Sequence, residues 1–438
     1  MHLLPNKKRG NHKKHTNWCH CLSRQKTFVH VDKWLKFPKT NKIKRPDCVN
    51  NLCNKDNGIL VYSNKNELLS YDNAFIQARE NEGTTLVIHF LPTTDCQLSC
   101  FYCFENGINR KISMSNKELN ESVKWVSEYL SINKDVSKIK LVLFGGEPLL
   151  RKDIIYSAIP LFDGITKQNQ KEFSVEIITN GELLDDKFSS FISRYGWERV
   201  QITLDGNKET HDERRFGKEK RPTFDKIIKN ICMLIECKYM EKIDIRINFD
   251  LSIVDSVIAL IKFLASTGYQ KNISLSFGVL ENPTTNKYCS QQCSQLPNDE
   301  IIGEKCLLFW KTAKENDFSI PEEIMAGPLC IATTKHSVVI QPDGCLQKCF
   351  CSVGKKEYNF SSISILPIKY AQDNRFEMFN KRTVDCRKNK CAYLPICNGG
   401  CVWDAVSLYG DSGFKKPACR KIFLSKINLG LLNLNYND

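Results

Sequence analysis

The sequence lacks any apolar run that approaches the roughly 20 residues needed to span a bilayer. Its first residues, MHLLPNKKRGNHKKH, also lack the apolar stretch of a secretory signal. Both absences argue against membrane insertion and export, so we expect a cytoplasmic protein with no membrane partner. Internal repeats are lacking as well, and nothing in the sequence predicts a repeat architecture.

Acidic residues are scarce at the N-terminus. Residues 1–46 contain 13 Lys or Arg and one acid, Asp32, which accounts for most of the formal net charge of +14. We interpret 1–53 as a basic, flexible arm that is able to attract an acidic peptide or a nucleic acid, and 54–85 as a short extension. Two interpretations stay open for the thiols of the arm, a small metal knuckle or unrelated side chains: Cys19, Cys21, Cys48 and Cys53, with His20.

Cysteine is abundant, with 21 of 438 residues, and it falls in clusters. In a reducing compartment such thiols indicate metal ligands more than disulfides. A disulfide-rich secreted protein is the alternative, and the missing signal argues against it.

Short β-branched and apolar runs alternate with amphipathic stretches from residue 86 onward. The predicted strands are 86–91, 139–145, 173–179, 199–204, 242–249 and 272–280. The predicted helices include 116–130, 224–238 and 255–266. This alternation indicates parallel strands joined by crossovers. We predict an α/β fold, a partial (β/α)6 TIM-type barrel over 86–281, with the active site at the carboxyl ends of its strands.

The alternation stops after residue 281. We interpret 282–329 as a bridging segment and 330–425 as a C-terminal cysteine-rich domain. The tail, 426–438, belongs to the stretch FLSKINLGLLNL, which predicts a closing helix.

Distinctive motifs follow the first four predicted strands. TTDCQLSCFYC follows the first, GGEP (145–148) ends the second, TNG (179–181) the third and LDG (204–206) the fourth. Since parallel strands direct their carboxyl ends to one side, all four motifs are predicted to face the same mouth.

Three cysteines of the first motif, Cys96, Cys100 and Cys103, have no fourth beside them. Thiolates are the usual ligands of iron–sulfur clusters. Three thiolates on a four-iron cluster leave one iron with an open position, as in catalytic metal sites. Zinc is the alternative, but this spacing is unusual for zinc and no nearby His supplies a fourth ligand.

The spacing Cys96-x3-Cys100-x2-Cys103, with Tyr102 before the last cysteine, resembles the signature of the radical SAM superfamily. The resemblance implies a [4Fe–4S] cluster whose open iron binds S-adenosylmethionine (SAM). Reductive cleavage of SAM then gives methionine and a 5′-deoxyadenosyl radical, which abstracts hydrogen from the substrate. A reducing electron donor such as a flavodoxin or ferredoxin is implied as well.

GGEP resembles the segment of that family that binds the methionyl amine. Gly145 and Gly146 allow close backbone approach, Glu147 offers an acceptor, and Pro148 stiffens the turn. Further contacts to SAM are implied at Tyr102, near the adenine, and at Asn180 and Thr203, where a role in turn formation is the alternative. For Asp205 two interpretations stay open, a role that only fixes the strand-to-loop turn and a contact to the cofactor.

The C-terminal cysteines resemble the SPASM extension of peptide-modifying radical SAM enzymes. They follow the patterns Cys330-x13-Gly344-x4-Cys349 and Cys386-x4-Cys391-x5-Cys397-x3-Cys401, with Cys419 later. The gap of four residues after Cys386 departs from the usual two. By resemblance, one auxiliary [4Fe–4S] cluster is held by Cys386, Cys391, Cys397 and Cys419, and a second by Cys330, Cys349 and Cys401. The fourth ligand of the second cluster stays open among Cys306, Cys345, Cys351 or a site free for substrate; zinc knuckles are the alternative for both.

Several other reactive side chains are interpreted as structural. Cys232 and Cys237 are predicted to be core or surface thiols, and His211 a structural residue rather than a base. Arg214 and Arg215 are predicted to be solvated, with contact to an anionic group as the alternative.

The combination predicts an enzyme that oxidatively modifies a ribosomally made peptide. The alternative is an anaerobic sulfatase-maturating enzyme, but that branch places Asp after the cysteine of Gly-x4-Cys, where this chain has Phe350. A different class, a zinc-containing scaffold that binds nucleic acid through its basic arm, is the remaining hypothesis; our favoured partner is a peptide, with no nucleic acid.

Overall fold

The structure is a computed structural model. It describes residues 84–103, 105, 111–280, 299–321, 330–371, 381–389, 391 and 393–436. The basic arm 1–53, with its possible metal knuckle, and all but two residues of the extension 54–85 lie outside the described residues.

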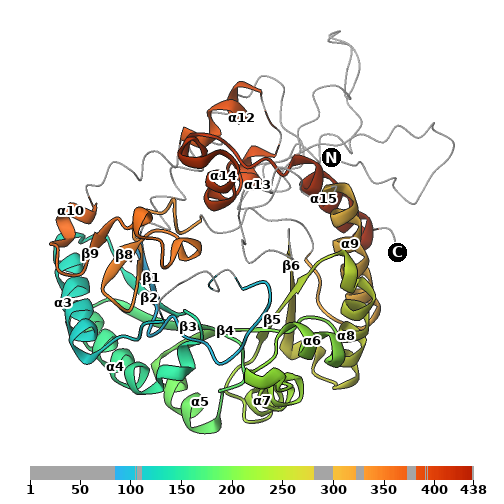
Figure 1. The fold of residues 1–438 in the computed structure, drawn as a ribbon, viewed down its shortest axis with the longest axis horizontal. Helices are drawn as coiled ribbons and strands as arrows, with labels where there is room; N and C mark the ends of the chain where they lie inside the picture. The colour runs from blue at the N-terminus through green and yellow to red at the C-terminus, as the bar shows by residue number, and fades with distance from the viewer. Residues whose placement is uncertain are drawn as a thin grey trace, which may run out of the picture.

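Six parallel strands form the centre of the fold, as predicted. They are β1 (Thr85–Phe90), β2 (Lys138–Leu143), β3 (Glu172–Thr179), β4 (Trp197–Thr203), β5 (Ile243–Phe249) and β6 (Ile273–Val279). Each pairs in parallel with the next along the chain. The sheet curves without closing (Figure 1), which confirms the α/β partial barrel.

Helices cover the outer side of this arc. They are α3 (Asn116–Ile132), α4 (Lys152–Gln168), α5 (Asp186–Ile192), α6 (Lys208–Arg214), α7 (Phe224–Glu236) and α8 (Val254–Ser266). The three predicted helices correspond to α3, α7 and α8 within a few residues. No helix in the part of the chain that the structure describes is long and apolar enough to cross a membrane.

Local sequence fixes where the crossover helices begin. Ser115 accepts a hydrogen bond from the Lys117 amide (3.1 Å), and the Glu118 carboxylate accepts one from the Ser115 amide (3.1 Å), which together form a capping box. Asp185 caps α5 and Asn207 caps α6 in the same way. Side-chain caps therefore fix the first turns of α3, α5 and α6.

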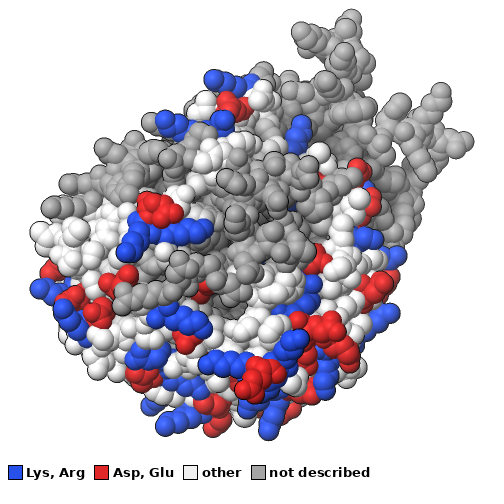
Figure 2. Space-filling view, viewed as in Figure 1, with Lys and Arg blue, Asp and Glu red and all other residues white. Residues whose placement is uncertain are grey.

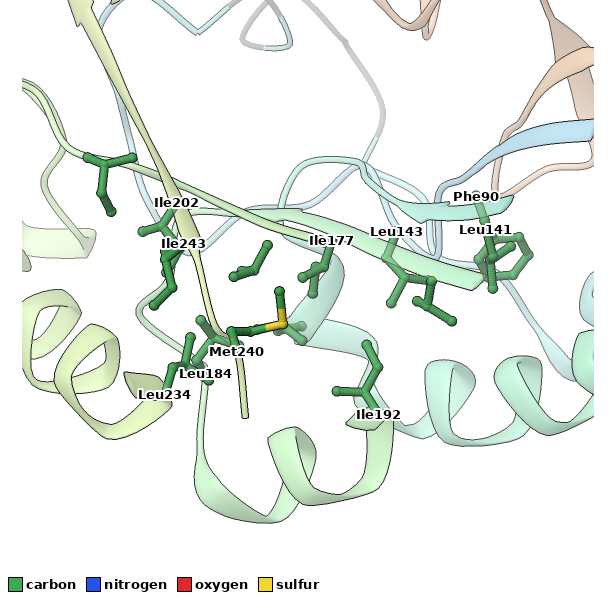
Figure 3. Packing of buried hydrophobic residues seen from close by; sticks show 14 of the residues in the cluster. Phe90, Leu141, Leu143, Ile177, Leu184, Ile192, Ile202, Leu234, Met240 and Ile243 are labelled. Atoms are coloured by element: carbon green, nitrogen blue, oxygen red, sulfur yellow. The ribbon is translucent and has the colours of Figure 1, made fainter. Parts of the chain in front are cut away.

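The main core lies between the strands and the helices. Along β1, Leu86, Ile88 and Phe90 are buried in this cluster, whereas His89 points to the other side and contacts Phe144 and Phe350. Figure 3 shows part of this core, where Met240 and Leu184 lie below Ile177 and Ile202. The period-two alternation leaves the inner side of the strands for polar residues and the site.

The C-terminal segment extends the barrel sheet, which the sequence did not predict. Strand β7 (Ser337–Ile340) pairs in parallel with β1, and β8 (Cys345–Gln347) and β9 (Ser361–Ser362) continue antiparallel. The described strands form one nine-stranded sheet in the order β6-β5-β4-β3-β2-β1-β7-β8-β9. The segment that carries Cys349 is therefore tied to the strand that carries the Cys96 loop.

Helix α9 (Asp299–Glu315) occupies part of the predicted bridging segment, and α15 (Lys421–Tyr436) lies along it (Figure 1). Lys426 of α15 pairs with Glu304 of α9 at 2.6 Å. The closing helix is present, and it includes most of the residues assigned to the tail. The described residues of the C-terminal part also form the short helices α10 (Pro367–Ala371), α12 (Val384–Lys388), α13 (Leu394–Cys397) and α14 (Val402–Tyr409).

Candidate active site

The three-cysteine loop lies at the carboxyl end of β1. Cys100 is buried, with 8% of its surface exposed, and Cys96 and Cys103 are half-buried. Leu98, Tyr102 and Leu280 pack around them. The thiols therefore lie in a small apolar cluster at the carboxyl end of β1.

Two neighbouring segments hold this loop. The Thr94 amide donates to the Ile112 carbonyl (2.9 Å), and the Ser99 amide donates to the Phe216 carbonyl (2.8 Å). Within the loop, the Cys103 amide donates to the Cys100 carbonyl (3.1 Å). Because both flanks are anchored, the spacing of the thiols is set by backbone hydrogen bonds.

The GGEP segment at the end of β2 binds the same loop directly. The Gly146 amide donates to the Thr93 carbonyl (3.2 Å) and the Glu147 amide to the Asp95 carbonyl (2.8 Å). A Cβ on Gly145, where φ is +137°, would lie 2.4 Å from the Thr93 oxygen, and one on Gly146 would lie 2.2 Å from the Asp95 oxygen. Only glycine allows the two backbones to approach this closely.

Gly146→Ala is expected to lower the free energy of unfolding by about 1–3 kcal/mol, since its new methyl group overlaps fixed backbone rather than a flexible side chain. Urea unfolding measures the change. Gly164→Ala is the matched control, because Gly164 lies inside α4 with open space around it, and it is expected to gain about 0.5–1 kcal/mol. Equal effects of the two substitutions would contradict this role of Gly146.

Glu147 is fully buried, and its carboxylate accepts hydrogen bonds from neighbouring residues of the chain. Its Oε1 accepts from the Leu149 amide (3.0 Å) and the Thr179 hydroxyl (2.8 Å), and its Oε2 accepts from the Asn180 amide (2.8 Å). Burial raises the pKa of Glu147 to about 7 against the effect of these donors. The carboxylate thus ties the end of β3 to the buried turn at Pro148, and its contact with an amine stays a prediction.

Asn180 lies beside the first thiol. Its Nδ2 is 3.7 Å from the Cys96 sulfur, and its Oδ1 accepts from Gln97 Nε2 (3.2 Å). Gln97 also donates to Glu182 (3.1 Å), so this loop residue joins the cysteine motif to β3. Thr203 is buried at the end of β4, where it pairs in register with Arg246 of β5.

A buried polar network underlies Tyr102. The tyrosine hydroxyl donates to Asp205 and accepts from Arg215 (2.5 Å) and from Asn248 Nδ2 (3.3 Å). Asp205 is fully buried, and its other oxygen accepts from the Asn248 amide (2.9 Å). Asp205 therefore does more than fix a turn, since it joins the cysteine loop to β5.

The prediction that both arginines are solvated is wrong. Only 8% of Arg214 and 7% of Arg215 is exposed. Arg214 pairs with Asp250 (2.9 Å) and lies over the ring of Phe101, 4.8 Å from its centre. The partners come from the ends of β4 and β5, which explains why the local sequence gave no sign of burial.

His211 is structural, as predicted. It is fully buried, its Nδ1 accepts from the Asp205 amide (3.2 Å) and its Nε2 lies 3.1 Å from the Thr223 hydroxyl. Burial holds the pKa of His211 well below its usual range, so the ring stays neutral.

The donor chemistry of the loop fits a cluster. Burial raises the pKa of Cys103 to about 12, and coordination to a metal is one way to stabilise the thiolate form of such a thiol. In the described residues, no three His, Cys, Asp or Glu side chains converge so as to hold one metal ion. A zinc ion requires its ligands at about 2.3 Å from one point, whereas each cysteine of a cubane binds a different iron.

The C-terminal cysteines gather in two groups. Cys386 is within electrostatic range of Cys391, Cys397 and Cys419. Cys401 is within range of Cys349 and Cys330. These are the two sets that the resemblance predicted as ligands.

Of the candidates for a further ligand in the second group, only Cys351 reaches it. A hydrogen bond from the Cys351 side chain lowers the pKa of Cys349. Cys306 is instead buried in the barrel core on α9, and Cys345 lies on β8 beside Asp343. Neither Cys232 nor Cys237, on and directly after α7, belongs to either group.

Phe350 closes the inner side of the barrel near β1. Its ring stacks on His89, with centres 5.7 Å apart, and contacts Phe144, which directly precedes Gly145. Sequence analysis missed His89, Gln97 and Asn248. The available signal was the position of His89 and Asn248 in the alternation of their strands, and the position of Gln97 within the three-cysteine loop.

Comparison with known proteins agrees with this geometry. Residues 90–245 match the Radical SAM superfamily. The chain is similar to a cysteine-type anaerobic sulfatase-maturating enzyme of Clostridium novyi, with 25% identity over 342 residues, 70% of this chain and 85% of that protein. It is also similar to the radical SAM cyclopropyl synthase TigE of Paramaledivibacter caminithermalis, with 22% identity over 48% of this chain and 46% of that protein.

Solved structures share the fold. One, described as native anSMEcpe with bound AdoMet and Cp18Cys peptide, superposes with a TM-score of 0.63 and 20% identity, covering 81% of this chain and 99% of that one. Streptococcus suis SuiB bound to precursor peptide SuiA gives 0.51 and 15% identity, covering 85% and 87%.

Proposed function

Because the chain carries a radical SAM domain over residues 90–245, we propose that it is an enzyme that uses SAM and [4Fe–4S] clusters to modify a peptide oxidatively. The observation that carries this is the meeting of the three-cysteine loop with GGEP at one end of the strands. Three cysteines in one loop, joined by backbone hydrogen bonds to a glycine turn, match both halves of a SAM site.

The roles of the residues follow from their positions. Cys96, Cys100 and Cys103 hold three irons, and the cofactors when bound supply a 5′-deoxyadenosyl radical. Gly145 and Gly146 allow the GGEP turn to lie directly against the backbone of the three-cysteine loop, which brings both halves of the site together. The Tyr102 network fixes the last turn of the loop.

Each auxiliary cluster is assigned to one of the two groups of cysteines in the C-terminal part. Cys386, Cys391, Cys397 and Cys419 hold the first, and Cys330, Cys349 and Cys401, completed by Cys351, hold the second. A fully ligated cluster has no iron free for substrate, so it suits the acceptance of an electron rather than substrate binding. Abstraction of hydrogen followed by loss of one electron gives a net two-electron oxidation of the peptide.

Phe350 favours a crosslinking peptide maturase over a sulfatase-maturating enzyme. By resemblance, sulfatase-maturating enzymes carry an Asp directly after the cysteine of the Gly-x4-Cys segment. In this chain Phe350 follows that cysteine, Cys349, and its ring stacks on His89. The similarity to a sulfatase-maturating enzyme keeps that function as the second candidate, as does Asp404, whose carboxylate lies within electrostatic range of Cys349.

The first expected partner is a peptide, whose acidic leader would bind the basic arm. The second is an electron donor of the flavodoxin or ferredoxin type in the cytoplasm. On the face shown in Figure 2, Lys and Arg are interspersed with Asp and Glu. The sequence places most of the chain's excess positive charge in its first 46 residues.

Iron analysis of protein reconstituted anaerobically with iron and sulfide tests the proposal. We expect a brown protein with about twelve irons per chain, three clusters of four, and release of 5′-deoxyadenosine from SAM. About four irons would remove the auxiliary clusters. A colourless zinc protein with salt-sensitive nucleic-acid binding would instead support the scaffold hypothesis.

Incubation with a synthetic cysteine-containing sulfatase peptide separates the two enzymatic candidates. We expect no conversion of the cysteine to an aldehyde, as followed by mass spectrometry. Aldehyde formation would establish the second candidate and overturn the first.

A further inference from the structure

A buried arginine lies between the two groups of cysteines in the C-terminal part. Arg382 is 2% exposed, which makes it one of the largest fully buried side chains of the chain. It precedes α12, four residues before Cys386.

Its guanidinium is bound to one loop. Nη1 donates to the carbonyls of Gly399 (3.2 Å) and Gly400 (2.8 Å), and Nη2 donates to that of Asn398 (3.4 Å). This loop separates Cys397 of the first group from Cys401 of the second. Arginine therefore fixes the spacing between a ligand of each cluster.

The same loop contacts a third ligand segment. The Ala418 amide, next to Cys419, donates to the Gly399 carbonyl (2.9 Å). A Cβ on Gly400 would lie 2.0 Å from the Ala418 carbonyl, so the approach is too close for any other residue. Arg382 thus lies where the two proposed sites meet.

The charge of Arg382 acts on thiols from both groups. They are Cys330 and Cys401 of one, and Cys397 and Cys386 of the other. Burial lowers the pKa of Arg382, and these thiols oppose that effect. A positive charge removed from water is screened little, so it acts on both groups at once.

We propose that Arg382 sets the reduction potential of both auxiliary clusters, by holding the 398–400 loop between them and placing one fixed positive charge beside their ligands. The inference rests on the proposed function, since it requires that both clusters exist. Reduction adds one electron to a cluster, and a neighbouring cation stabilises the more negative state. Arg382 therefore favours the reduced form of each, which suits centres that take an electron from a substrate radical.

Redox titration of the full chain tests this. The parent carries Cys96→Ala, Cys100→Ala and Cys103→Ala, so that only the auxiliary clusters give electron paramagnetic resonance signals on reduction with dithionite. In Arg382→Gln, we expect the ratio of reduced to oxidised cluster at a fixed potential to fall at least tenfold at both sites. A tenfold fall corresponds to about 59 mV for one electron.

Two further variants separate charge from fold. Arg382→Lys keeps the charge and is expected to retain both potentials, and Lys388→Gln, which removes an exposed cation two residues after Cys386, is expected to change neither. Unchanged potentials in Arg382→Gln with iron retained would overturn the proposal. If Arg382→Gln loses iron, retention of iron and potential in Arg382→Lys supports the need for the charge, and loss in both overturns it.

The triple cysteine variant, which is the parent of the Arg382 variants, shows whether a failure concerns this inference or the proposed function. About eight irons per chain and two signals mean that the auxiliary clusters exist, whatever the Arg382 variants show. A parent without iron contradicts the proposed function itself.

Discussion

Cys100→Ala is expected to reduce the release of 5′-deoxyadenosine from SAM to below detection. Cys100 is the most buried of the three loop thiols, and its removal leaves two ligands for a cluster that needs three. The substituted chain should also lose about four of roughly twelve irons. Chromatography of anaerobic reactions with dithionite, together with iron analysis, measures both effects.

Cys237→Ala is the matched control. Cys237 is an exposed thiol directly after α7, far along the chain from either proposed cluster region. This variant should retain full iron content and full SAM cleavage. Persistent cleavage in Cys100→Ala would contradict the assigned role of the loop, and equal losses in both variants would point to a general effect of removing thiols.

The centre of the fold was predictable from local patterns. Each of the six strands is a short β-branched run, and the motifs at 96–103, 145–148 and 204–206 follow strands whose direction is dictated by crossovers. Parallel strands bring such motifs together without any knowledge of side-chain contacts. This is why the location of the site, though not the contacts of its side chains, followed from the sequence.

Elements whose partners are distant in sequence were not predictable. Strand β7 pairs with β1 about 250 residues earlier, and no local pattern specifies that neighbour. Helix α4 was obscured by the Pro160 and Gly164 inside it. Helix α9 has acids in its first turn, Asp299 and Glu300, and apolar residues at helical spacing, so that signal was present and missed.

The buried arginines show the same limit. Arg214 and Arg215 stand in a strongly polar stretch, ETHDERR, that is typical of a solvated surface. Their burial depends on Asp250 and Asp205, which follow different strands. Charged residues are buried almost only when paired, and the pairing arises when strands β4 and β5 place both carboxylates at the mouth of the barrel.

Arg215→Gln is expected to lower the free energy of unfolding by about 3–5 kcal/mol, as for the loss of one partner of a buried ion pair. Asp205 is fully buried 3.9 Å from the Arg215 guanidinium, and the substitution leaves its carboxylate without that charge. Burial already raises the pKa of Asp205, which shows how little solvation the site offers. Urea unfolding of the reconstituted chain measures the change.

A double variant distinguishes the uncompensated charge from a general loss of packing. Asp205→Asn with Arg215→Gln removes both charges, so the pair should recover at least half of the loss seen in Arg215→Gln alone. Lys208→Ala, which breaks a half-exposed pair with Asp225, should cost no more than about 1 kcal/mol. Additive losses in the double variant would mean that Arg215 acts through its packing on Tyr102, and that the carboxylate beneath the cysteine loop is solvated by the hydroxyl of Tyr102 and the backbone of Asn248 alone.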